Sequence, residues 1–431
     1  MTRRESIDII PCGPIVGSIR PPGSKSLTNR ALVCAALASG ESHLDGVLDS
    51  EDTRVMIDSL GRLGISVAHD PLARTAIVRG CSGSIPATSA DLHVANSGTT
   101  IRFLAAMVAL GHGRFVLDGV ERMRQRPIGD LIEALRQLSV SAEALSPGGC
   151  PPVRIEADGL PGGATEVAGS VSSQFLSGLL LAAPYASGPL TIRVVGSLVS
   201  RPYIEMTLAV MRRFGAEVAV APSGDSFVVS NTRHYVGRSE SIEPDASAAS
   251  YFWGAAAITG GRVTVEGLGP SALQGDVRFV DVLERMGCTV ERHDDRITVV
   301  GGKLTGIDVD MNAISDTVQT LAAVALFADG PTRVRGVAHN RHKETDRIGD
   351  LATELRRLGA EVEEHEDGLT IMPRPLRGAA LRTYGDHRMA MSLALVGLRV
   401  ADVTILDPEC TSKTYPEYFD DLERLTGSAR A

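Results

Sequence analysis

The sequence has no long apolar run and no continuous apolar segment near its start. A membrane-spanning helix needs roughly 18 consecutive apolar residues, and a secretory signal needs an unbroken apolar core. Neither pattern occurs, because MTRRESIDII is interrupted by charge. We therefore expect a globular cytoplasmic protein, and 431 residues with 43% hydrophobic content predict two or more domains.

Paired cysteines and an excess of basic residues are also missing. The six cysteines are scattered without a C-x-x-C pair, so the sequence predicts neither a zinc site nor a disulfide framework. A formal net charge of -9 disfavours a general nucleic-acid or anionic-membrane surface. Any anion must therefore be held by a local basic cluster.

One glycine is missing from a segment that otherwise looks like a phosphate-binding loop. The segment PPGSKSLTNRALVCAALASG contains Lys25, Ser26 and Arg30 but lacks the upstream glycine of the pattern G-x-x-x-x-G-K-[ST]. A nucleotide-binding P-loop, as in a kinase, is therefore disfavoured. Lys25, Ser26 and Arg30 must therefore have a role other than nucleotide binding in a P-loop.

A helix ending recurs along the chain about every 72 to 76 residues. It reads LGRLG at 60–64 and LRRLG at 355–359, and most copies precede two alternating segments typical of a β-hairpin. A second set of helices, such as SAASYFWGAAAITG, is apolar on nearly every side, as in helices packed inside a domain. The sequence thus predicts a unit of β-α-β-α-β-β content used about six times.

The last repeat lacks its strands, whereas the chain begins with the strand-like SIDIIP and GPIVGSIR. We expect these N-terminal strands to complete the C-terminal repeats. Residues 23–242 would then form a contiguous three-repeat domain, and residues 1–22 with 243–431 a discontinuous one, with hinge crossings near 21–23 and 242–245. The alternative, a single extended solenoid, would leave its terminal repeat uncapped.

Hydroxyl and basic residues stand where the internal helices are expected to begin. Ser, Asn and Asp are ordinary N-caps, and capping accounts fully for Asp245. Capping does not account for Lys25, Arg30, Arg102 and Arg388, because a basic residue early in a helix opposes the helix dipole. Free backbone N–H groups, hydroxyls and cations together predict anion sites at these ends.

The outer helices repeat this pattern with Arg126-Pro127, Arg201-Pro202 and Asp346-Arg347 at their expected starts. Proline at the first helical position is a structural signal, but the arginine before it is not required. The neighbouring segment HNRHKETDRIGD could be a solvated loop. Its Lys343 and Glu344, with Arg347, would instead place a proton-transfer carboxylate between two anion-binding cations.

Nine motifs occur in a fixed order: GSKSLTNRA, NSGTTIRF, RMRQRPIGDL, GSVSSQFLSGLL, SRPYIEMT, DMNAISD, HKETDR, YGDHRMAM and CTSKTYPEYF. With them the chain resembles the EPSP synthase (3-phosphoshikimate 1-carboxyvinyltransferase) family from about residue 10 to its C-terminus. The resemblance implies an α/β fold, a two-domain inverse α/β prism of six βαββαβ repeats, three per domain. It also implies a ligand site in the interdomain cleft and a monomer of the shikimate pathway.

The family transfers the enolpyruvyl group of phosphoenolpyruvate to the 5-hydroxyl of shikimate 3-phosphate and releases phosphate. These two small molecules are the implied partners, without nucleic acid, membrane, metal or cofactor, because addition and elimination need only positioning and proton transfer. The residues implied for shikimate 3-phosphate are Lys25, Ser26, Arg30, Ser172, Ser173, Gln174, Ser200, Tyr203, Asp316, His339 and Lys343. Those implied for phosphoenolpyruvate are Lys25, Asn96, Gly98, Arg126, Gln174, Arg347, Arg388 and Lys413, with Arg102 close by.

The resemblance also implies catalytic roles. Glu344 would protonate carbon 3 of the enol and reclaim that proton during elimination, while Asp316 would take the 5-hydroxyl proton. Lys25 would stabilise charge on the departing phosphate, and His387 would support the cations.

Two positions carry narrower expectations. Gly98 is the small residue expected where the phosphoenolpyruvate analogue glyphosate binds, so the resemblance implies sensitivity to glyphosate. A contact with the shikimate ring is expected from His339 or from the adjacent Asn340, and the sequence leaves that choice open.

Two other functions compete with this one. UDP-N-acetylglucosamine 1-carboxyvinyltransferase carries a cysteine five residues before the Arg-Pro pair, where this chain has Glu121. A non-catalytic repeat protein that binds phosphorylated ligands would not need Lys25, Asp316 and the Lys343-Glu344 pair intact. Both are therefore disfavoured.

Overall fold

The computed structural model describes residues 4–427, and these form two compact units. Unit 2 is the contiguous segment Gly23–Ile242, and unit 1 combines the residues up to Pro22 with those from Glu243 onward. Within the described residues, each unit contains three buried helices, three amphipathic helices and three small sheets.

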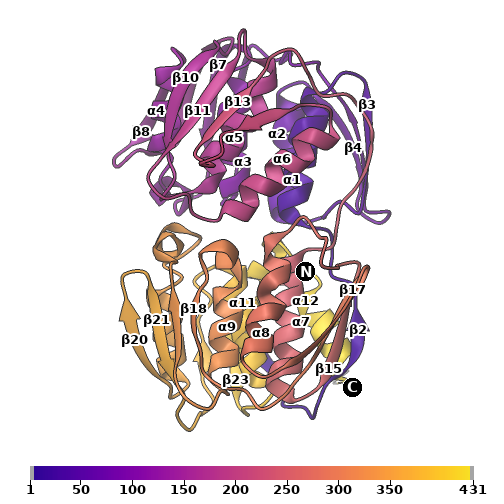
Figure 1. Ribbon diagram of the computed structural model, residues 1–431, viewed down its shortest axis with the longest axis vertical. Coiled ribbons are helices and arrows are strands. Elements are labelled where there is room, and N and C mark those ends of the chain that lie inside the picture. The colour runs from indigo at the N-terminus through magenta and orange to yellow at the C-terminus, as the bar shows by residue number, and fades with distance from the viewer. Residues whose placement is uncertain (1–3, 428–431) are drawn as a thin grey trace. The chain divides into compact units, whose positions relative to one another are not determined.

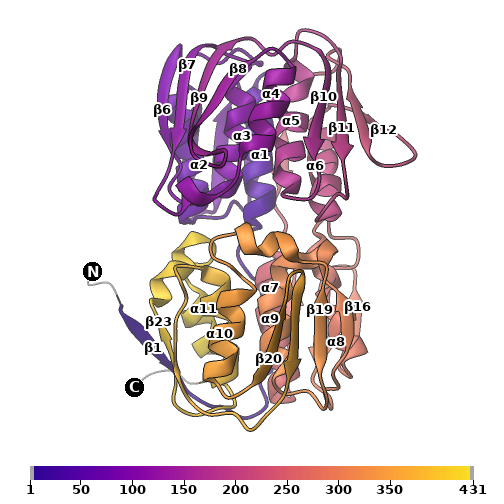
Figure 2. The same ribbon diagram turned by 90° about the vertical axis from the view of Figure 1, so that its left-hand side faces the viewer.

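The buried helices of unit 2 are α1 (Lys25–Leu37), α3 (Gly98–Val108) and α5 (Ser173–Ala182). They are buried along almost their full length and contact one another, as the sequence predicted. Sheets lie on both sides of them in Figure 2. The amphipathic helices are α2 (Glu51–Arg62), α4 (Gly129–Gln137) and α6 (Arg201–Arg213).

The sheets of unit 2 share one pattern, in which two parallel strands continue into an antiparallel hairpin. Their orders are β14-β3-β5-β4, β6-β7-β9-β8 and β10-β11-β13-β12. The strands are β3 (Glu41–Asp45), β4 (Ser66–Asp70), β5 (Thr75–Arg79), β6 (Ser89–His93), β7 (His112–Asp118), β8 (Ser141–Ser146), β9 (Cys150–Asp158), β10 (Gly163–Ala168), β11 (Leu190–Val195), β12 (Val218–Val220), β13 (Ser226–Val229) and β14 (Ser239–Ser241).

The buried helices of unit 1 are α7 (Ala246–Thr259), α9 (Val318–Ala325) and α11 (His387–Gly397), which also contact one another. Figure 1 shows them flanked by sheets within this unit. The amphipathic helices are α8 (Phe279–Arg285), α10 (Gly349–Arg357) and α12 (Tyr418–Thr426). Four 3₁₀ turns precede helices or join them: η3 (Gly275–Arg278), η4 (Asn312–Thr317), η5 (Ala338–His342) and η6 (Pro408–Lys413).

The N-terminal strands divide between two sheets of unit 1. β1 (Ser6–Ile9) pairs antiparallel with β23 (Val403–Leu406) in the last sheet, β22-β23-β1. β2 (Val16–Ile19) instead pairs parallel with β15 (Arg262–Glu266), in the sheet β16-β17-β15-β2. The last repeat therefore receives one N-terminal strand, and the other joins the repeat that follows Glu243. The remaining strands are β16 (Thr289–His293), β17 (Arg296–Val300), β18 (Asp308–Asp310), β19 (Thr332–Arg335), β20 (Glu361–His365), β21 (Gly368–Met372) and β22 (Ala380–Leu381).

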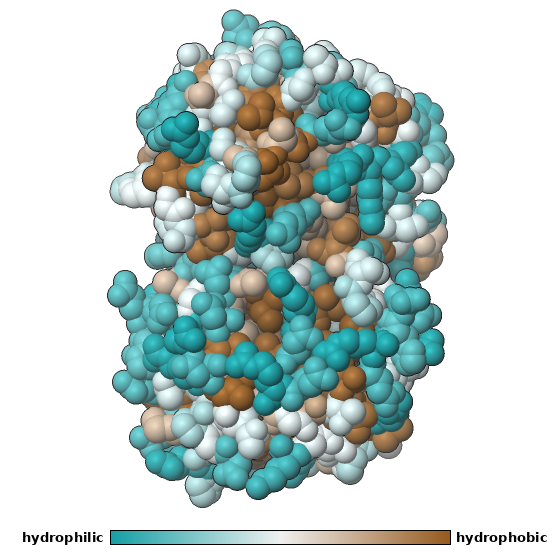
Figure 3. All heavy atoms as spheres, viewed as in Figure 1, coloured by the Kyte–Doolittle hydropathy of each residue, from teal (hydrophilic) through white to brown (hydrophobic). Residues whose placement is uncertain are grey.

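Buried and exposed residues alternate along most strands, so the sheets have a buried face and a more exposed face. β3, for example, buries alternate residues and exposes the others. The face in Figure 3 is accordingly mostly hydrophilic, with separate hydrophobic patches. Among residues 4–427, no helix is long and apolar enough to cross a membrane.

Candidate functional site

The expected site residues of unit 2 lie at the N-terminal ends of its helices or in the turns just before them. We call them the unit 2 cluster: Lys25, Ser26, Arg30, Asn96, Gly98, Arg102, Arg126, Ser172, Ser173, Gln174, Ser200 and Tyr203. Several hydroxyls here do cap helices, since Ser172 Oγ accepts from the Gln174 backbone N–H at 3.2 Å. A capping hydroxyl accepts a backbone hydrogen bond but keeps its own O–H to donate to an anion.

Arg30 is a buried cation whose described contacts are all neutral. It is 1% exposed, and its guanidinium donates to Thr207 Oγ1 at 2.8 Å and to the carbonyl oxygens of Ser26 and Tyr203 at 2.9 and 3.1 Å. Burial lowers the pKa of Arg30 to about 10, so the side chain stays charged at neutral pH. Within residues 4–427 no carboxylate forms an ion pair with it. An unpaired buried charge is costly, which favours an anionic ligand here.

Arg102 fixes the side chain of Gln174. Its Nη1 donates to Gln174 Oε1 at 2.7 Å, and its Nη2 donates to the carbonyl oxygen of Pro127 at 3.1 Å. The guanidinium lies 5.1 Å from the centre of the Phe175 ring. Gln174 Nε2 donates in turn to Thr99 Oγ1 at 3.1 Å, so the starts of α3 and α5 are joined by polar contacts.

Arg126 is held against the turn that precedes α3. Its Nη1 donates to the backbone oxygen of Asn96 at 2.9 Å and to Asn96 Oδ1 at 3.2 Å. The sequence pattern placed Arg126-Pro127 at a helix start, but α4 begins at Gly129, so Pro127 precedes the helix. Arg126 therefore belongs to the connecting turn, where a guanidinium can face a ligand without opposing a helix dipole.

Gly98 lies directly against the guanidinium of Arg126. A Cβ at this position would lie 2.5 Å from Arg126 Nη2 and 2.9 Å from its Cζ. Gly98→Ala should therefore displace the guanidinium and raise the KM for an anionic substrate held by Arg126 about tenfold, with a smaller change in kcat, because one charge-assisted contact is worth about 1.5–3 kcal/mol. Steady-state kinetics would measure this change.

The control for Gly98→Ala is Gly61→Ala. Gly61 lies in α2, and a Cβ there would meet nothing within 4 Å. This variant should keep the parent kinetics. An unchanged KM in Gly98→Ala would contradict the contact between Gly98 and a functional Arg126.

Lys25 and Ser200 complete the unit 2 cluster. Lys25 Nζ lies 3.2 Å from Asp52 Oδ2, and this carboxylate is buried in the first turn of α2. Ser200 precedes α6 with a left-handed backbone (φ 53°, ψ 44°), which is uncommon for a residue other than glycine. Such strain is found most often at functional positions.

Three carboxylates contact Arg347 in unit 1, two of them expected site residues. We define the unit 1 cluster as the expected residues Asp316, His339, Lys343, Glu344, Arg347, His387, Arg388 and Lys413, together with Asp386. Arg347 is 1% exposed, and its Nη2 lies 2.8 Å from Glu344 Oε2. Its Nε lies 2.7 Å from Asp386 Oδ2, and its Nη1 lies 3.2 Å from Asp316 Oδ1. Burial would lower the pKa of Arg347, but the three carboxylates outweigh burial and raise it.

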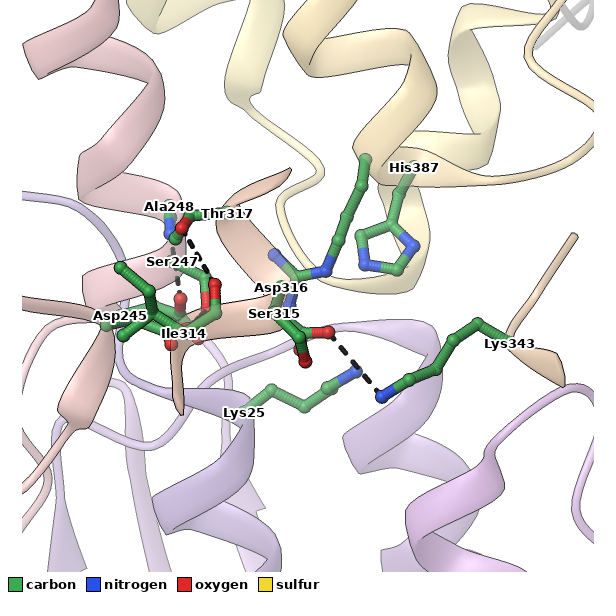
Figure 4. Close-up of polar contacts among 12 residues, drawn as sticks. Lys25, Asp245, Ser247, Ala248, Ile314, Ser315, Asp316, Thr317, Lys343 and His387 are labelled. Carbon is green, nitrogen blue, oxygen red and sulfur yellow. Dashed lines mark hydrogen bonds and ion pairs between the residues drawn. The ribbon is translucent and has the colours of Figure 1, made fainter. Parts of the chain in front are cut away.

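Asp316 is shared among three cations rather than used as a helix cap. Its Oδ1 lies 3.7 Å from Lys343 Nζ as well as facing Arg347, and its Oδ2 accepts from Arg388 Nη2 at 2.8 Å. Figure 4 shows the contact between Asp316 and Lys343, with His387 nearby. One guanidinium, that of Arg347, thus joins the two carboxylates assigned to proton transfer.

His339 and Asn340 both contact Ser315. His339 Nε2 lies 2.9 Å from Ser315 Oγ, and Asn340 Nδ2 donates to the Ser315 carbonyl oxygen at 3.0 Å. Asn340 is completely buried, its backbone carbonyl oxygen accepts from the Arg347 backbone N–H, and its Oδ1 has no hydrogen-bond partner among the described residues. The choice between His339 and Asn340 for the ring contact therefore stays a prediction. Burial, then the charge of Lys343, lowers the pKa of His339 to about 3, which keeps the ring neutral.

His387 and Lys413 are both buried in unit 1. His387 is 1% exposed, and its Nδ1 lies 3.6 Å from Asp386 Oδ1. Lys413 is 4% exposed and ends η6, which packs against α11.

The sequence analysis missed several carboxylates and hydroxyls that hold these cations. Asp386 accepts hydrogen bonds from Arg347 through both carboxylate oxygens and also caps α11. Asp52 forms an ion pair with Lys25. Thr207 and Tyr251 contact Arg30 and Arg388. The position of Asp52 in the first turn of α2 could have drawn attention to it. However, acidic residues are common in first turns because they interact favourably with the helix dipole, so this position alone does not indicate a partner for Lys25.

No group of three His, Cys, Asp or Glu side chains among the described residues is arranged to hold a metal ion. The repeated α/β architecture and the charged clusters define a class of protein that binds small anionic molecules at helix ends.

Comparisons with known proteins specify the family. The profile of EPSP synthase (3-phosphoshikimate 1-carboxyvinyltransferase) matches residues 9–422. The chloroplastic 3-phosphoshikimate 1-carboxyvinyltransferase of Arabidopsis thaliana is 47% identical over 98% of this chain and 85% of that protein. The enzyme of Vibrio vulnificus is 46% identical over 98% and 99%. A solved EPSP synthase from Acinetobacter baumannii superposes with a TM-score of 0.81 at 26% identity, covering 98% of both chains. The chain belongs to the EPSP synthase family.

Proposed function

We propose that the protein transfers the 1-carboxyvinyl group of phosphoenolpyruvate to the 5-hydroxyl of shikimate 3-phosphate. The observation that carries this proposal is the Glu344–Arg347–Asp316 arrangement, in which one guanidinium contacts two carboxylates at 2.8 and 3.2 Å. The reaction needs one acid and one base of this kind. The names of the relatives support these two substrates, and so does Arg30, a buried cation that an anionic ligand would neutralise.

The chemistry proceeds by addition and elimination. Glu344 donates a proton to carbon 3 of phosphoenolpyruvate, and the 5-hydroxyl oxygen attacks carbon 2 while Asp316 accepts the hydroxyl proton. The tetrahedral adduct then loses the carbon 3 proton to Glu344 and expels phosphate, whose charge Lys25 stabilises. Asp316 releases the hydroxyl proton to the departing phosphate or to solvent, so both carboxyl groups return to their starting states.

Charge neutralisation explains the number of cations. Each substrate carries a phosphate and a carboxylate, so bringing the two together requires surrounding positive charge. We assign Arg30, with the hydroxyls of Ser26, Ser172, Ser173 and Ser200, to shikimate 3-phosphate. The remaining shikimate 3-phosphate ligands are Lys25, Gln174, Tyr203, Asp316, His339 and Lys343.

We assign Arg126 and Arg388 to phosphoenolpyruvate. Arg347 joins them although it already contacts three carboxylates, because its described contacts leave one Nη1 hydrogen to donate to the substrate. The remaining phosphoenolpyruvate ligands are Lys25, Asn96, Gly98, Gln174 and Lys413. The proposal needs only one copy of the chain.

Phosphate release tests the proposal directly. The protein should release phosphate only when shikimate 3-phosphate and phosphoenolpyruvate are both present, and glyphosate should inhibit the release. Replacing shikimate 3-phosphate with UDP-N-acetylglucosamine should give none, because the position of that enzyme's cysteine is Glu121 here. Binding of both substrates without phosphate release would instead indicate a non-catalytic binding protein.

A further inference from the structure

Three segments of unit 1 meet behind the Asp316–Arg388 ion pair. The 3₁₀ turn η3 packs against both the start of α7 and η4, which carries Asp316. Figure 4 shows Asp245 and Ser247 at the start of α7 beside Ile314–Thr317. Gln274 fixes this junction, because its Oε1 accepts from the Ala246 N–H at 3.0 Å and its Nε2 donates to the Pro244 carbonyl oxygen at 2.7 Å.

Asp276 is the carboxylic acid buried at this junction. It lies in η3 and is 3% exposed, and Ser247 Oγ donates a hydrogen bond to its Oδ2. One turn further along α7, the Tyr251 hydroxyl oxygen accepts from Arg388 Nη1 at 3.4 Å. The same face of α7 therefore contacts Asp276 and the arginine that pairs with Asp316.

The charges around Asp276 belong mainly to the proposed site. Burial and then the charge of Asp316 raise the pKa of Asp276 to about 6, although Ser247 and Arg388 oppose this rise. Asp245, at the start of α7, makes a smaller raising contribution. The charged residues of η3 itself and of the adjacent α8 are exposed: Arg278, Asp281, Glu284 and Arg285.

This coupling acts in both directions. If ionised Asp316 makes Asp276 hold its proton more tightly, ionised Asp276 must make Asp316 a stronger base by the same free energy. Ionised Asp276 also attracts Arg388, which weakens the hold of Arg388 on Asp316. Both effects favour proton transfer from the substrate hydroxyl to Asp316.

We propose that Asp276 is a positioning residue for the base Asp316, and that its ionised carboxylate strengthens this base through the Asp316–Arg388 pair. The inference rests on the proposed function, in which Asp316 accepts the 5-hydroxyl proton. Asp276 acts through Asp316 and touches neither substrate.

The first test uses the protein without substrates. A carboxyl whose pKa rises on folding, here from 3.8 to about 6, stabilises the folded state at low pH, and this contribution is lost as pH rises through about 6. Asp276→Asn does not titrate. As pH rises from about 4 to 6, the parent should lose stability that the variant does not lose, so the urea unfolding midpoint of Asp276→Asn should increase relative to that of the parent. Above about pH 6 the difference between the two midpoints should stay constant. A difference that does not change with pH would overturn the charge coupling.

The second test compares kcat as a function of pH. The ratio of parent to Asp276→Asn kcat should be near one at pH 5 and should rise several-fold, by about 3- to 10-fold, at pH 8, because a stronger base speeds proton transfer. Titration of the substrate phosphates cancels in this ratio. A ratio that is the same at every pH would show a merely structural role and would overturn the proposal.

Two further variants make the test specific. Ser247→Ala removes a hydrogen bond that lowers the pKa of Asp276, so the rise of kcat should move to higher pH. Glu354→Gln alters a different buried carboxylate, which accepts from the Tyr384 hydroxyl at 2.7 Å, and should keep the parent profile. Absence of phosphate release from the parent protein would overturn the proposed function, whereas the unfolding test reports on the coupling independently.

Discussion

Glu344→Gln should lower kcat by about 10²–10⁴-fold, because a positioned general acid contributes about that much to a proton-transfer step. The amide keeps the size of the side chain and can still accept from Arg347 Nη2, which Glu344 faces at 2.8 Å. The affinity for shikimate 3-phosphate should therefore change little. Steady-state kinetics would show the loss, and in D₂O the recovered phosphoenolpyruvate should no longer gain deuterium at carbon 3.

Two comparisons isolate the role of Glu344. Glu361→Gln changes an exposed carboxylate of β20 that pairs with Arg374, and it should keep the parent kcat. Asp316→Ala should also reduce kcat strongly, but it removes a partner of Lys343, Arg347 and Arg388 as well. Near-normal turnover or undiminished deuterium incorporation in Glu344→Gln would refute its role as the acid.

Arg347→Met should lower the free energy of unfolding of the protein by about 3–5 kcal/mol, because removing one partner of a buried ion pair leaves the opposite charge uncompensated. The buried carboxylates of Asp386 and Glu344 would lose the cation that each contacts within 2.8 Å. Urea unfolding at neutral pH would measure the loss. The variant should also fail to release phosphate, since Arg347 joins the proposed acid and base.

Arg335→Met provides the matched control. Arg335 is about half exposed and pairs with Asp308 on the surface, where solvent screens the interaction. Its loss should leave the unfolding midpoint almost unchanged. Arg347→Lys should be intermediate, because an ammonium group cannot reproduce the planar contacts to several carboxylates. A stability of Arg347→Met equal to that of the control would contradict the ion-pair network described for unit 1.

The sequence was most informative about local structure. The all-apolar pattern of segments such as SAASYFWGAAAITG predicted buried helices, and α7 is buried from its first residue to its last. Asp245 was assigned to capping alone, and its Oδ1 accepts from the Ala248 N–H at 2.9 Å. Periodicity and capping depend on neighbours a few residues apart, so they can be read from one sequence.

Long-range pairing was harder to predict. SIDIIP and GPIVGSIR have similar strand patterns, and nothing in their alternation assigns β1 to β23 and β2 to β15. Asp386 was missed as a counter-ion for the same reason, since it and Arg347 are 39 residues apart. The motifs identified the cations and the carboxylates Asp316 and Glu344, but the folded chain was needed to show which carboxylate pairs with which cation. The roles assigned to individual residues remain predictions.

Unit 1 is built from two separate parts of the chain, and this affects the order in which the protein folds during its synthesis. β1 and β2 are made first, yet their partners β23 and β15 follow about 400 and 245 residues later. Unit 2 has all its strands within Gly23–Ile242 and can close its last sheet when β14 pairs with β3. The middle of the chain therefore completes its fold before the beginning does, and β1 must stay unpaired until almost the whole chain has been translated.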